Sequence, residues 1–264
     1  MEIAGYFSMF LVGGSLGLIG SGGSILTVPI LVYLFHQSAV SATSYSLFVV
    51  GVSSLLGVWR YHQEKLVDYR TALTFALPSF LGTYLARRVL MPFLPSVIFN
   101  LGEVSYSKDQ LIMTVFALVM LGASTSMIRS RPRAGAVEGQ APRKKVLLAS
   151  LGLVVGFVAG FVGAGGGFLI IPTLVVFAKM SMPPAVGTSL LIISANSLFG
   201  FGGDLLARSE VNWLFLLSIT AIALLGTWGG SYVAPSVPAS KLKPAFGWFV
   251  LLMGSYIMLR QWRG

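Results

Sequence analysis

The stretch GGSLGLIGSGGS occupies residues 13–24, and a second stretch, GFVAGFVGAGGG, occupies residues 156–167. Every glycine between positions 17 and 23 recurs 143 positions later, and Pro29 recurs as Pro172. Both stretches lie inside long apolar segments, where a glycine in a helix interior costs roughly 1 kcal/mol relative to alanine. Adjacent glycines therefore predict a helix break in each stretch.

The order of motifs continues through both parts of the chain. Further matched pairs are Ala42-Thr43-Ser44 with Gly187-Thr188-Ser189, Ser54-Leu55-Leu56-Gly57 with Ser197-Leu198-Phe199-Gly200, Val67-Asp68-Tyr69 with Val211-Asn212-Trp213, and Leu81-Gly82-Thr83 with Leu225-Gly226-Thr227. These matches predict an internal duplication, with a first repeat over 1–128, a linker over 129–145 and a second repeat over 146–264. Internal repeats of this kind are typical of secondary transporters.

The composition predicts a polytopic membrane protein. Of the 264 residues, 55% are hydrophobic and only 10% are charged, whereas a soluble domain carries about 25% charged residues. No cysteine is present, which excludes disulfides, thiolate metal sites and cysteine nucleophiles. The chain begins without the basic segment and cleavage site of a secretory signal, so we expect its first apolar stretch to remain as a membrane segment.

The hydropathy pattern predicts an all-α fold of roughly eight hydrophobic segments and up to ten helices. The apolar stretches cover 3–35, 39–59, 71–91, 110–128, 146–178, 185–203, 211–233 and 245–259. Each half then holds a glycine-broken first segment followed by three membrane helices. All acidic residues lie outside these stretches or at their ends, so we expect spans without buried charge. A carboxylate proton relay and a membrane-embedded acid–base enzyme are therefore not expected.

The basic residues predict the orientation in the membrane. Residues 129–145 read RSRPRAGAVEGQAPRKK, with six basic residues and one acidic residue. The positive-inside rule makes this flexible linker cytoplasmic and the protein a multi-pass protein of the inner or plasma membrane. The net charge of +10 then marks orientation, and no nucleic-acid partner is expected.

The topology of the repeats has three readings. Each first stretch, 3–35 and 146–178, holds 33 residues, whereas about 20 residues cross the hydrocarbon core. One long broken helix gives parallel repeats, while two tilted crossings or a re-entrant hairpin give inverted repeats. Both arrangements place 12 of the 18 basic residues in the cytoplasm, so charge does not choose between them. The excess length favours inverted repeats.

The two glycine motifs are candidate anion sites. Unwound backbone within a membrane is tolerated only inside protein or beside a water-filled cavity. A new apolar helix is expected after each motif, over 25–35 and 168–178, and the free N–H groups at a helix start bind anions. Two such starts would form an anion pocket without a buried arginine. The alternative is close helix packing through small residues, because Gly13, Gly17 and Gly20 have helical spacing. The candidate substrate-binding residues of the motifs are Gly20, Ser21, Gly22, Gly23, Ser24, Gly163, Gly165, Gly166 and Gly167.

Polar residues in the next segments are further candidates. Thr43, Ser44, Thr188 and Ser189 either bond back to their own helices or donate hydrogen bonds to an oxyanion. Asn196 either links two helices or contacts the ligand. Pro29 and Pro172 are expected at the structural helix breaks, as first-turn or kink prolines. Two isolated histidines, His36 and His62, make no metal site, and no cofactor is expected.

These motifs resemble the TauE/SafE family of membrane proteins, the sulfite exporter group. The family pattern G-x-x-G-x-G-G-G followed by P-x-L is similar to residues 17–31 and 160–174. The Thr-Ser stretches and the Val-Asp-Tyr and Val-Asn-Trp corners are also similar, and the resemblance covers nearly the whole chain. Ser24 replaces the last glycine of the first copy, and the 92–109 loop is longer than the family pattern suggests.

The resemblance implies a transporter of small sulfur-containing anions such as sulfite, sulfonates or sulfoacetate. The expected mechanism is alternating access around a site between the two halves. A passive anion channel and a transporter of another small organic anion are the alternatives. An enzyme or an assembly subunit is not favoured, because the spans offer almost no acids, bases or metal ligands. The expected partners are the anion and the lipid bilayer, and a homo-oligomer is left open.

Overall fold

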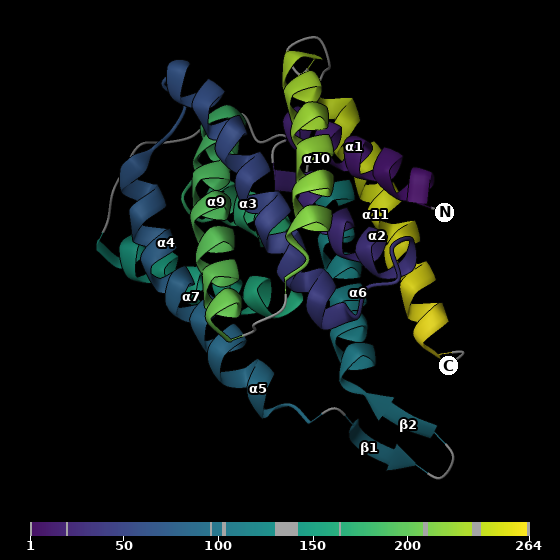
Figure 1. Cartoon of the computed structure of the whole chain (residues 1–264). Coiled ribbons are helices and arrows are strands. Elements are labelled where there is room, and N and C mark those ends of the chain that lie inside the picture. The colour runs from purple at the N-terminus through teal and green to yellow at the C-terminus, as the bar shows by residue number, and fades with distance from the viewer. Residues whose placement is uncertain are drawn as a thin grey trace.

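The computed structural model describes residues 2–19, 21–95, 97–101, 104–129, 142–163, 165–207, 211–233 and 239–262. Within these ranges the chain is a bundle of helices with one small β-hairpin at an end (Figure 1). The first part of the chain contains α1 (Glu2–Ile19), the 3-10 helix η1 (Ser21–Leu26), α2 (Thr27–Tyr33), α3 (Ala39–Gln63), α4 (Tyr69–Tyr84), the π-helix η2 (Leu85–Leu90), α5 (Met91–Phe93) and α6 (Lys108–Arg129). The second part contains α7 (Pro142–Val162), α8 (Gly167–Val176), α9 (Met182–Ala207), α10 (Trp213–Val233) and α11 (Ala239–Trp262).

The helices have the lengths and surfaces that a bilayer requires. Among the described residues, 3 helices, α3, α9 and α10, are long and apolar enough to cross a membrane. On α10 the side chains of Leu214 and Trp228 are 84% and 67% exposed, whereas Thr220 and Thr227 are buried. Large apolar side chains thus face outward while hydroxyls face inward, and an extended apolar surface of this kind marks contact with a membrane.

The all-α prediction holds for the described residues apart from one hairpin. Strand β1 (Val97–Leu101) pairs antiparallel with β2 (Val104–Ser107) in the long connection between α5 and α6. The ammonium of Lys108 donates hydrogen bonds to the carbonyl oxygens of Met91 and Leu94. These bonds tie the base of the hairpin to the end of α5.

Helices α3 and α9 pack together in opposite directions (Figure 1). A Cβ atom on Gly57 would lie 3.1 Å from Cδ1 of Leu190, and one on Gly51 would lie 2.9 Å from Leu198. Residue numbers therefore fall along α9 as they rise along α3. The absence of a side chain at these glycines is what lets the two helices approach closely.

Helix α1 packs on α10 through glycines at helical spacing. A Cβ atom on Gly13 would lie 1.9 Å from the carbonyl oxygen of Ala223, and one on Gly17 would lie 2.3 Å from that of Thr227. No side chain fits at such distances, so each of these positions requires glycine. Close helix packing is thus the structural role of Gly13 and Gly17, and the two helices run in the same direction.

The same contact recurs between α7 and α4. A Cβ atom on Gly156 would lie 2.1 Å from the carbonyl oxygen of Ser79, and one on Gly160 would lie 2.9 Å from Cα of Thr83. These helices also run in the same direction. The first helix of each part of the chain therefore packs on a long helix of the other part.

The two glycine motifs adopt different backbones. After α1 the chain forms the 3-10 helix Ser21–Leu26, which leads directly into α2. After α7 it makes a left-handed turn in which Gly163, Gly165 and Gly166 have φ of 75°, 65° and 71°. Within the described residues, positive-φ glycines occur only in this second motif.

Each proline lies in the short helix that follows its glycine motif. Pro29 lies in the first turn of α2, and Pro172 lies inside α8. A first-turn position suits proline because the N–H it lacks has no helical partner there. The breaks themselves lie at the glycines that precede these helices.

The close contact between α1 and α10 gives a matched pair of substitutions. A Cβ atom on Gly226 would lie 2.1 Å from the carbonyl oxygen of Phe10, whereas one on Gly229, on the same helix, meets nothing within 4 Å. We expect Gly226→Ala to lower the free energy of unfolding by about 1–3 kcal/mol because it overpacks the contact. Gly229→Ala should leave stability equal or higher, since alanine favours the helix. Thermal unfolding in detergent measures both, and equal midpoints would contradict the predicted packing.

Candidate functional site

One buried ion pair joins η2 to α9. The Nη1 atom of Arg87 lies 2.9 Å from Oδ2 of Asp204. The side chain of Arg87 is only 3% exposed and that of Asp204 is 12% exposed. The prediction that the apolar segments hold no buried charge is therefore wrong, because the stretch 71–91 contains this arginine and α9 extends past position 203 to include the aspartate.

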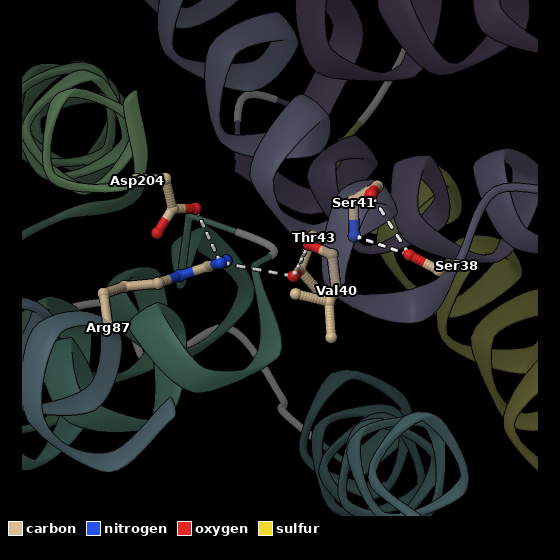
Figure 2. A network of polar contacts seen from close by, with 6 residues as sticks. All are labelled: Ser38, Val40, Ser41, Thr43, Arg87 and Asp204. Carbon is tan, nitrogen blue, oxygen red and sulfur yellow. Dashed lines mark hydrogen bonds and ion pairs between the residues drawn. The ribbon is translucent and has the colours of Figure 1, made fainter. Parts of the chain in front are cut away.

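The guanidinium also contacts α3. The Nη1 atom of Arg87 donates a hydrogen bond of 3.2 Å to Oγ1 of Thr43, whose hydroxyl in turn donates to the Val40 carbonyl at 3.0 Å (Figure 2). Ser38 caps the start of α3 by accepting a hydrogen bond from the Ser41 amide. The cap fixes where α3 begins and so places Thr43 one turn into the helix, facing the arginine.

The left-handed glycine turn lies beside the same threonine. A Cβ atom on Gly163 would lie 2.3 Å from Cβ and 2.5 Å from Cα of Thr43. Only glycine combines this contact with a positive φ at low energy. Thr43 thus lies between the ion pair and the start of the second glycine motif.

A tight layer of small and apolar groups lies one helical turn away from the ion pair. Gly200 precedes Asp204 by one turn, Thr83 precedes Arg87 and Leu47 follows Thr43. A Cβ atom on Gly200 would lie 3.0 Å from Cγ2 of Thr83 and 3.1 Å from Cδ1 of Leu47. The three helices therefore make close contact here, and we call these three residues the constriction.

A cluster of buried polar side chains lies beyond the constriction. A Cβ atom on Gly165 would lie 2.6 Å from Oγ of Ser197 and 3.0 Å from Val50 on α3. The amide of Asn196 donates a hydrogen bond to Oγ of Ser79 on α4. The second glycine turn is thus held against α9 at Ser197, next to the residue that links α9 to α4.

Several polar atoms in this region make no hydrogen bond. Among the described residues these include Oγ of Ser53, Ser54 and Ser197 and Oδ1 of Asn196, all of which are buried. Ser53 and Ser54 lie between the Gly51 and Gly57 contacts of α3, and the other two lie in the matching stretch of α9. We call these four residues the serine–amide cluster. Buried polar groups are normally bonded to protein or water, so the cluster is suited to hold water or a polar ligand.

The other predicted residues are distributed over different contacts. Gly23 packs back on α1, where a Cβ atom would lie 2.2 Å from Oγ of Ser15, and Ser24 and Ser44 are buried. Gly166 is the left-handed N-cap of α8, with no side chain capping it, and Gly167 begins that helix. Gly20 lies outside the described residues, and only the backbone of Ser21 and Gly22 is described.

Thr188 and Ser189 have structural partners. Oγ1 of Thr188 accepts a hydrogen bond of 2.9 Å from the backbone N–H of Asp68, the N-cap of α4. The hydroxyl of Ser189 donates to the Val186 carbonyl at 2.8 Å within its own helix. Of the two predicted Thr-Ser pairs, only the one at Thr43 lies beside the ion pair.

The ion pair is the feature that sequence reasoning missed. Its signal was the pair Arg87-Arg88 inside an otherwise uncharged stretch, together with an aspartate one turn after Gly200. Intramembrane charge is a functional-site hypothesis by default. No group of three metal-ligating side chains occurs in the described part of the chain, and the lack of a cofactor stays a prediction.

The sequence comparisons agree with the membrane character of the fold. Residues 6–257 match the sulfite exporter TauE/SafE family. The chain belongs to this family. It is 30% identical to a "Probable membrane transporter protein" of Xylella fastidiosa strain Temecula1, over 96% of this chain and 93% of the relative. The protein is therefore a membrane protein of a transporter family, which confirms the predicted resemblance.

Two more distant relatives have similar descriptions. The chain is 28% identical to the "Probable membrane transporter protein YunE" of Bacillus subtilis, over 86% of this chain and 85% of the relative. It is 26% identical to the "Probable membrane transporter protein MJ0441" of Methanocaldococcus jannaschii, over 76% of this chain and 71% of the relative. No solved structure matches the chain.

The hydrogen bond from the Asp68 N–H to Thr188 allows a test of whether the Thr188 hydroxyl has a structural role or binds a ligand. We expect Thr188→Val to lower the free energy of unfolding by about 1–3 kcal/mol, because it leaves the Asp68 N–H without its acceptor. Thr188→Ser keeps the hydroxyl and should retain most of the stability. Thermal unfolding compares the two, and the affinity for a transported ligand should stay unchanged in both. A loss of affinity in Thr188→Val without a loss of stability would assign the hydroxyl to the ligand.

Proposed function

We propose that this protein is a secondary transporter of small sulfur-containing anions such as sulfite, sulfonates or sulfoacetate. The observation that carries the proposal is the buried serine–amide cluster, in which three serine hydroxyls and the Asn196 Oδ1 atom have no hydrogen-bond partner and Ser197 contacts a glycine turn. Family membership supports transport across a membrane. The choice of anion rests on the chemistry of the cluster together with the family description.

The cluster offers donors where an oxyanion needs them. The hydroxyls of Ser53, Ser54 and Ser197 can each donate one hydrogen bond. Helix α8 begins next to the cluster with no side-chain cap, and the positive end of a helix dipole favours an anion. Oδ1 of Asn196 has no partner and can accept a hydrogen bond from a bound water or from a protonated oxygen of the anion.

We propose that the two parts of the chain form an inverted repeat. Three sets of contacts support it. In each set, a contact between the two parts recurs with every residue replaced by its equivalent in the other part, 143 or 144 positions away. The contact of Gly13 with Ala223 is equivalent to that of Gly156 with Ser79. The contact of Gly57 with Leu190 is equivalent to that of Gly200 with Leu47. The backbone N–H of Asp68 donates a hydrogen bond to Oγ1 of Thr188, and the equivalent N–H of Asn212 donates one to the hydroxyl of Tyr45. Because the equivalent helices α3 and α9 run in opposite directions, the exchange inverts the membrane orientation.

This exchange revises one of the matched sequence pairs. At an offset of 143, Thr188 corresponds to Tyr45 and not to Thr43. The resemblance of 42–44 to 187–189 is then shifted by two residues from the structural register. That shift explains why Thr43 lies beside the ion pair while Thr188 holds the start of α4.

The inverted arrangement also accounts for the basic residues. The end of α3, the loop after α8 and both ends of the 129–145 linker then share one face of the membrane, and positive-inside charge makes that face cytoplasmic. The ion pair and the β-hairpin then lie toward the opposite, extracytoplasmic face. In an inverted repeat, alternating access follows when the two halves exchange their conformations around the fixed cluster.

The constriction favours a transporter over a passive channel. Leu47, Thr83 and Gly200 are in close contact between the ion pair and the cluster. A channel needs a continuous path through the protein, whereas a transporter closes the path on one side at a time. We therefore prefer alternating access for this protein.

Uptake or efflux of sulfite and alkylsulfonates by proteoliposomes tests the function. We expect saturable flux that chloride and acetate do not support. Ser197→Ala should weaken sulfite binding about tenfold or more, since hydrogen bonds to charged groups contribute about 1.5–3 kcal/mol. Without the anion the variant should be as stable as the wild type, because the lost hydroxyl had no partner.

The matched control for this experiment is Ser189→Ala on the same helix. Its hydroxyl bonds to the Val186 carbonyl, so its removal should leave sulfite binding unchanged. Absence of saturable flux with every sulfur anion, in folded protein, would refute the substrate class. Equal affinities in the two serine variants would remove the cluster from the site.

The proposed topology can be tested directly because the chain has no cysteine. Single cysteines at Gln63, Ser181 and Phe93 replace residues that are exposed in the structure. We expect a membrane-impermeant maleimide to label Phe93→Cys in intact cells, and to label Gln63→Cys and Ser181→Cys only after lysis. Labelling of positions 63 and 181 from opposite faces would contradict the inverted repeat.

A further inference from the structure

We propose that Arg87 is a second anion-binding residue, and that the transported oxyanion binds there by replacing Asp204. The inference rests on the proposed function, since it assumes that the substrate is an anion. It adds a subsite, separate from the serine–amide cluster, with its own charge and its own position along the path. The ligand class is a small oxyanion with several acceptor oxygens.

The chemistry of the pair suits such an exchange. A guanidinium has five N–H donors in a plane that matches the oxygens of carboxylates and other oxyanions. In this structure it bonds a carboxylate oxygen and a hydroxyl from one nitrogen. Sulfite and sulfonates likewise present negatively charged acceptor oxygens, three in each anion. The carboxylate of Asp204, which Arg87 already binds, is therefore chemically similar to the proposed substrate.

Burial and charge determine which partner can leave. Arg87 is 3% exposed and Asp204 is 12% exposed, so the carboxylate is nearer to the surface of the protein than the guanidinium. Removing one partner of a buried pair and leaving the other charge alone costs about 3–5 kcal/mol. An arriving anion avoids that penalty, because the arginine stays neutralised while the aspartate turns toward solvent.

The position of the pair relates it to the path. Asp204 lies seven residues after Ser197 in α9, which is about 10 Å along a helix. The constriction lies between them, one turn from each. An anion on Arg87 would thus be held directly outside the closed layer, within two helical turns of the serine–amide cluster.

The pair also connects parts of the chain that must separate. Arg87 belongs to the first half and Asp204 to the second, and Thr43 adds a contact to α3. Replacing Asp204 by the anion breaks a direct link between η2 and α9. Under the proposed repeat, the positions equivalent to the pair hold Ser231 and Tyr61, so the link has no charged counterpart at the other face. Binding of the anion would therefore loosen one end of the molecule only.

Sulfite binding to the full-length protein in detergent tests the inference, by calorimetry and by anion-dependent thermal shift. In Asp204→Asn the competing carboxylate is gone and the shape is kept, so we expect sulfite to bind about tenfold more tightly than to the wild type. The thermal shift at a fixed sulfite concentration should also be larger. Glu64→Gln is the matched control, because it removes the carboxylate charge from the surface ion pair of Arg60 and Glu64. It should change neither the sulfite affinity nor the thermal shift.

The double variant Arg87→Gln/Asp204→Asn separates the inference from a structural role. It removes both charges, and neutral replacement of a buried ion pair is often tolerated. The gain of Asp204→Asn should disappear in it, and its thermal shift should be smaller than that of the wild type. A shift equal to that of the wild type would overturn the inference, even if Asp204→Asn alone does not fold.

The outcomes also separate this inference from the proposed function. If sulfite binding depends on Ser197 but Asp204→Asn gives no gain, the subsite is refuted and the transporter proposal stands. If the wild type binds sulfite and Asp204→Asn shows the Arg87-dependent gain, but proteoliposomes show no saturable flux of any sulfur anion, the subsite stands and the transporter proposal is refuted.

Discussion

The close contact of α3 with α9 is the constraint on which the rest of the structure depends. The two helices approach at Gly51, Gly57 and Gly200, where leucines of the partner helix occupy the space of the missing side chains. Because the crossing is antiparallel, it fixes which turns of the two helices lie together. The ion pair, the constriction and the serine–amide cluster are successive turns of this one crossing. A shift of one helix by a single turn would separate all three.

Polar groups are arranged along that crossing in an order that suits anion transport. The charged pair is complete in itself, so its net charge is zero and its burial is tolerable. The serine–amide cluster carries no charge, and the hydroxyls of its three serines have no hydrogen-bond partner. Under the proposed function, an anion that enters from the side of the ion pair meets a guanidinium first and neutral donors afterwards. Neutral donors hold an anion less firmly than a buried cation does, which favours its release on the far side.

The sequence predicted that the glycines of the two motifs matter for helix packing and for breaks in the helices. Glycine spacing at 13 and 17 reflects how closely two helices approach, and paired glycines at 165 and 166 reflect a left-handed turn. The sequence shows that a side chain is absent at these positions, but not which helix approaches them or which backbone each motif adopts. The family was identifiable from these glycine motifs.

The features that escaped the sequence depend on contacts between distant segments. Arg87 and Asp204 are 117 residues apart, and a window average over 71–91 hides a single arginine among apolar residues. The roles of Thr43 and Thr188 differ because the register of α3 against α9 is set by leucine–glycine contacts, which the local Thr-Ser motif does not report. The 3-10 form of Ser21–Leu26 was also not predictable, since the first motif has the same glycines as the left-handed second motif.

That difference between the two glycine motifs belongs with the ion pair. The left-handed turn at Gly163 lies on Thr43, and Thr43 accepts the hydrogen bond of Arg87. The charged pair and the left-handed turn are therefore two parts of one contact region. A repeat with two identical halves would have equal energies with either face closed. Under the proposed inverted repeat, a charged link at one face removes that equality. We therefore expect the protein to rest in the conformation that keeps Arg87 and Asp204 together until an anion competes for the arginine.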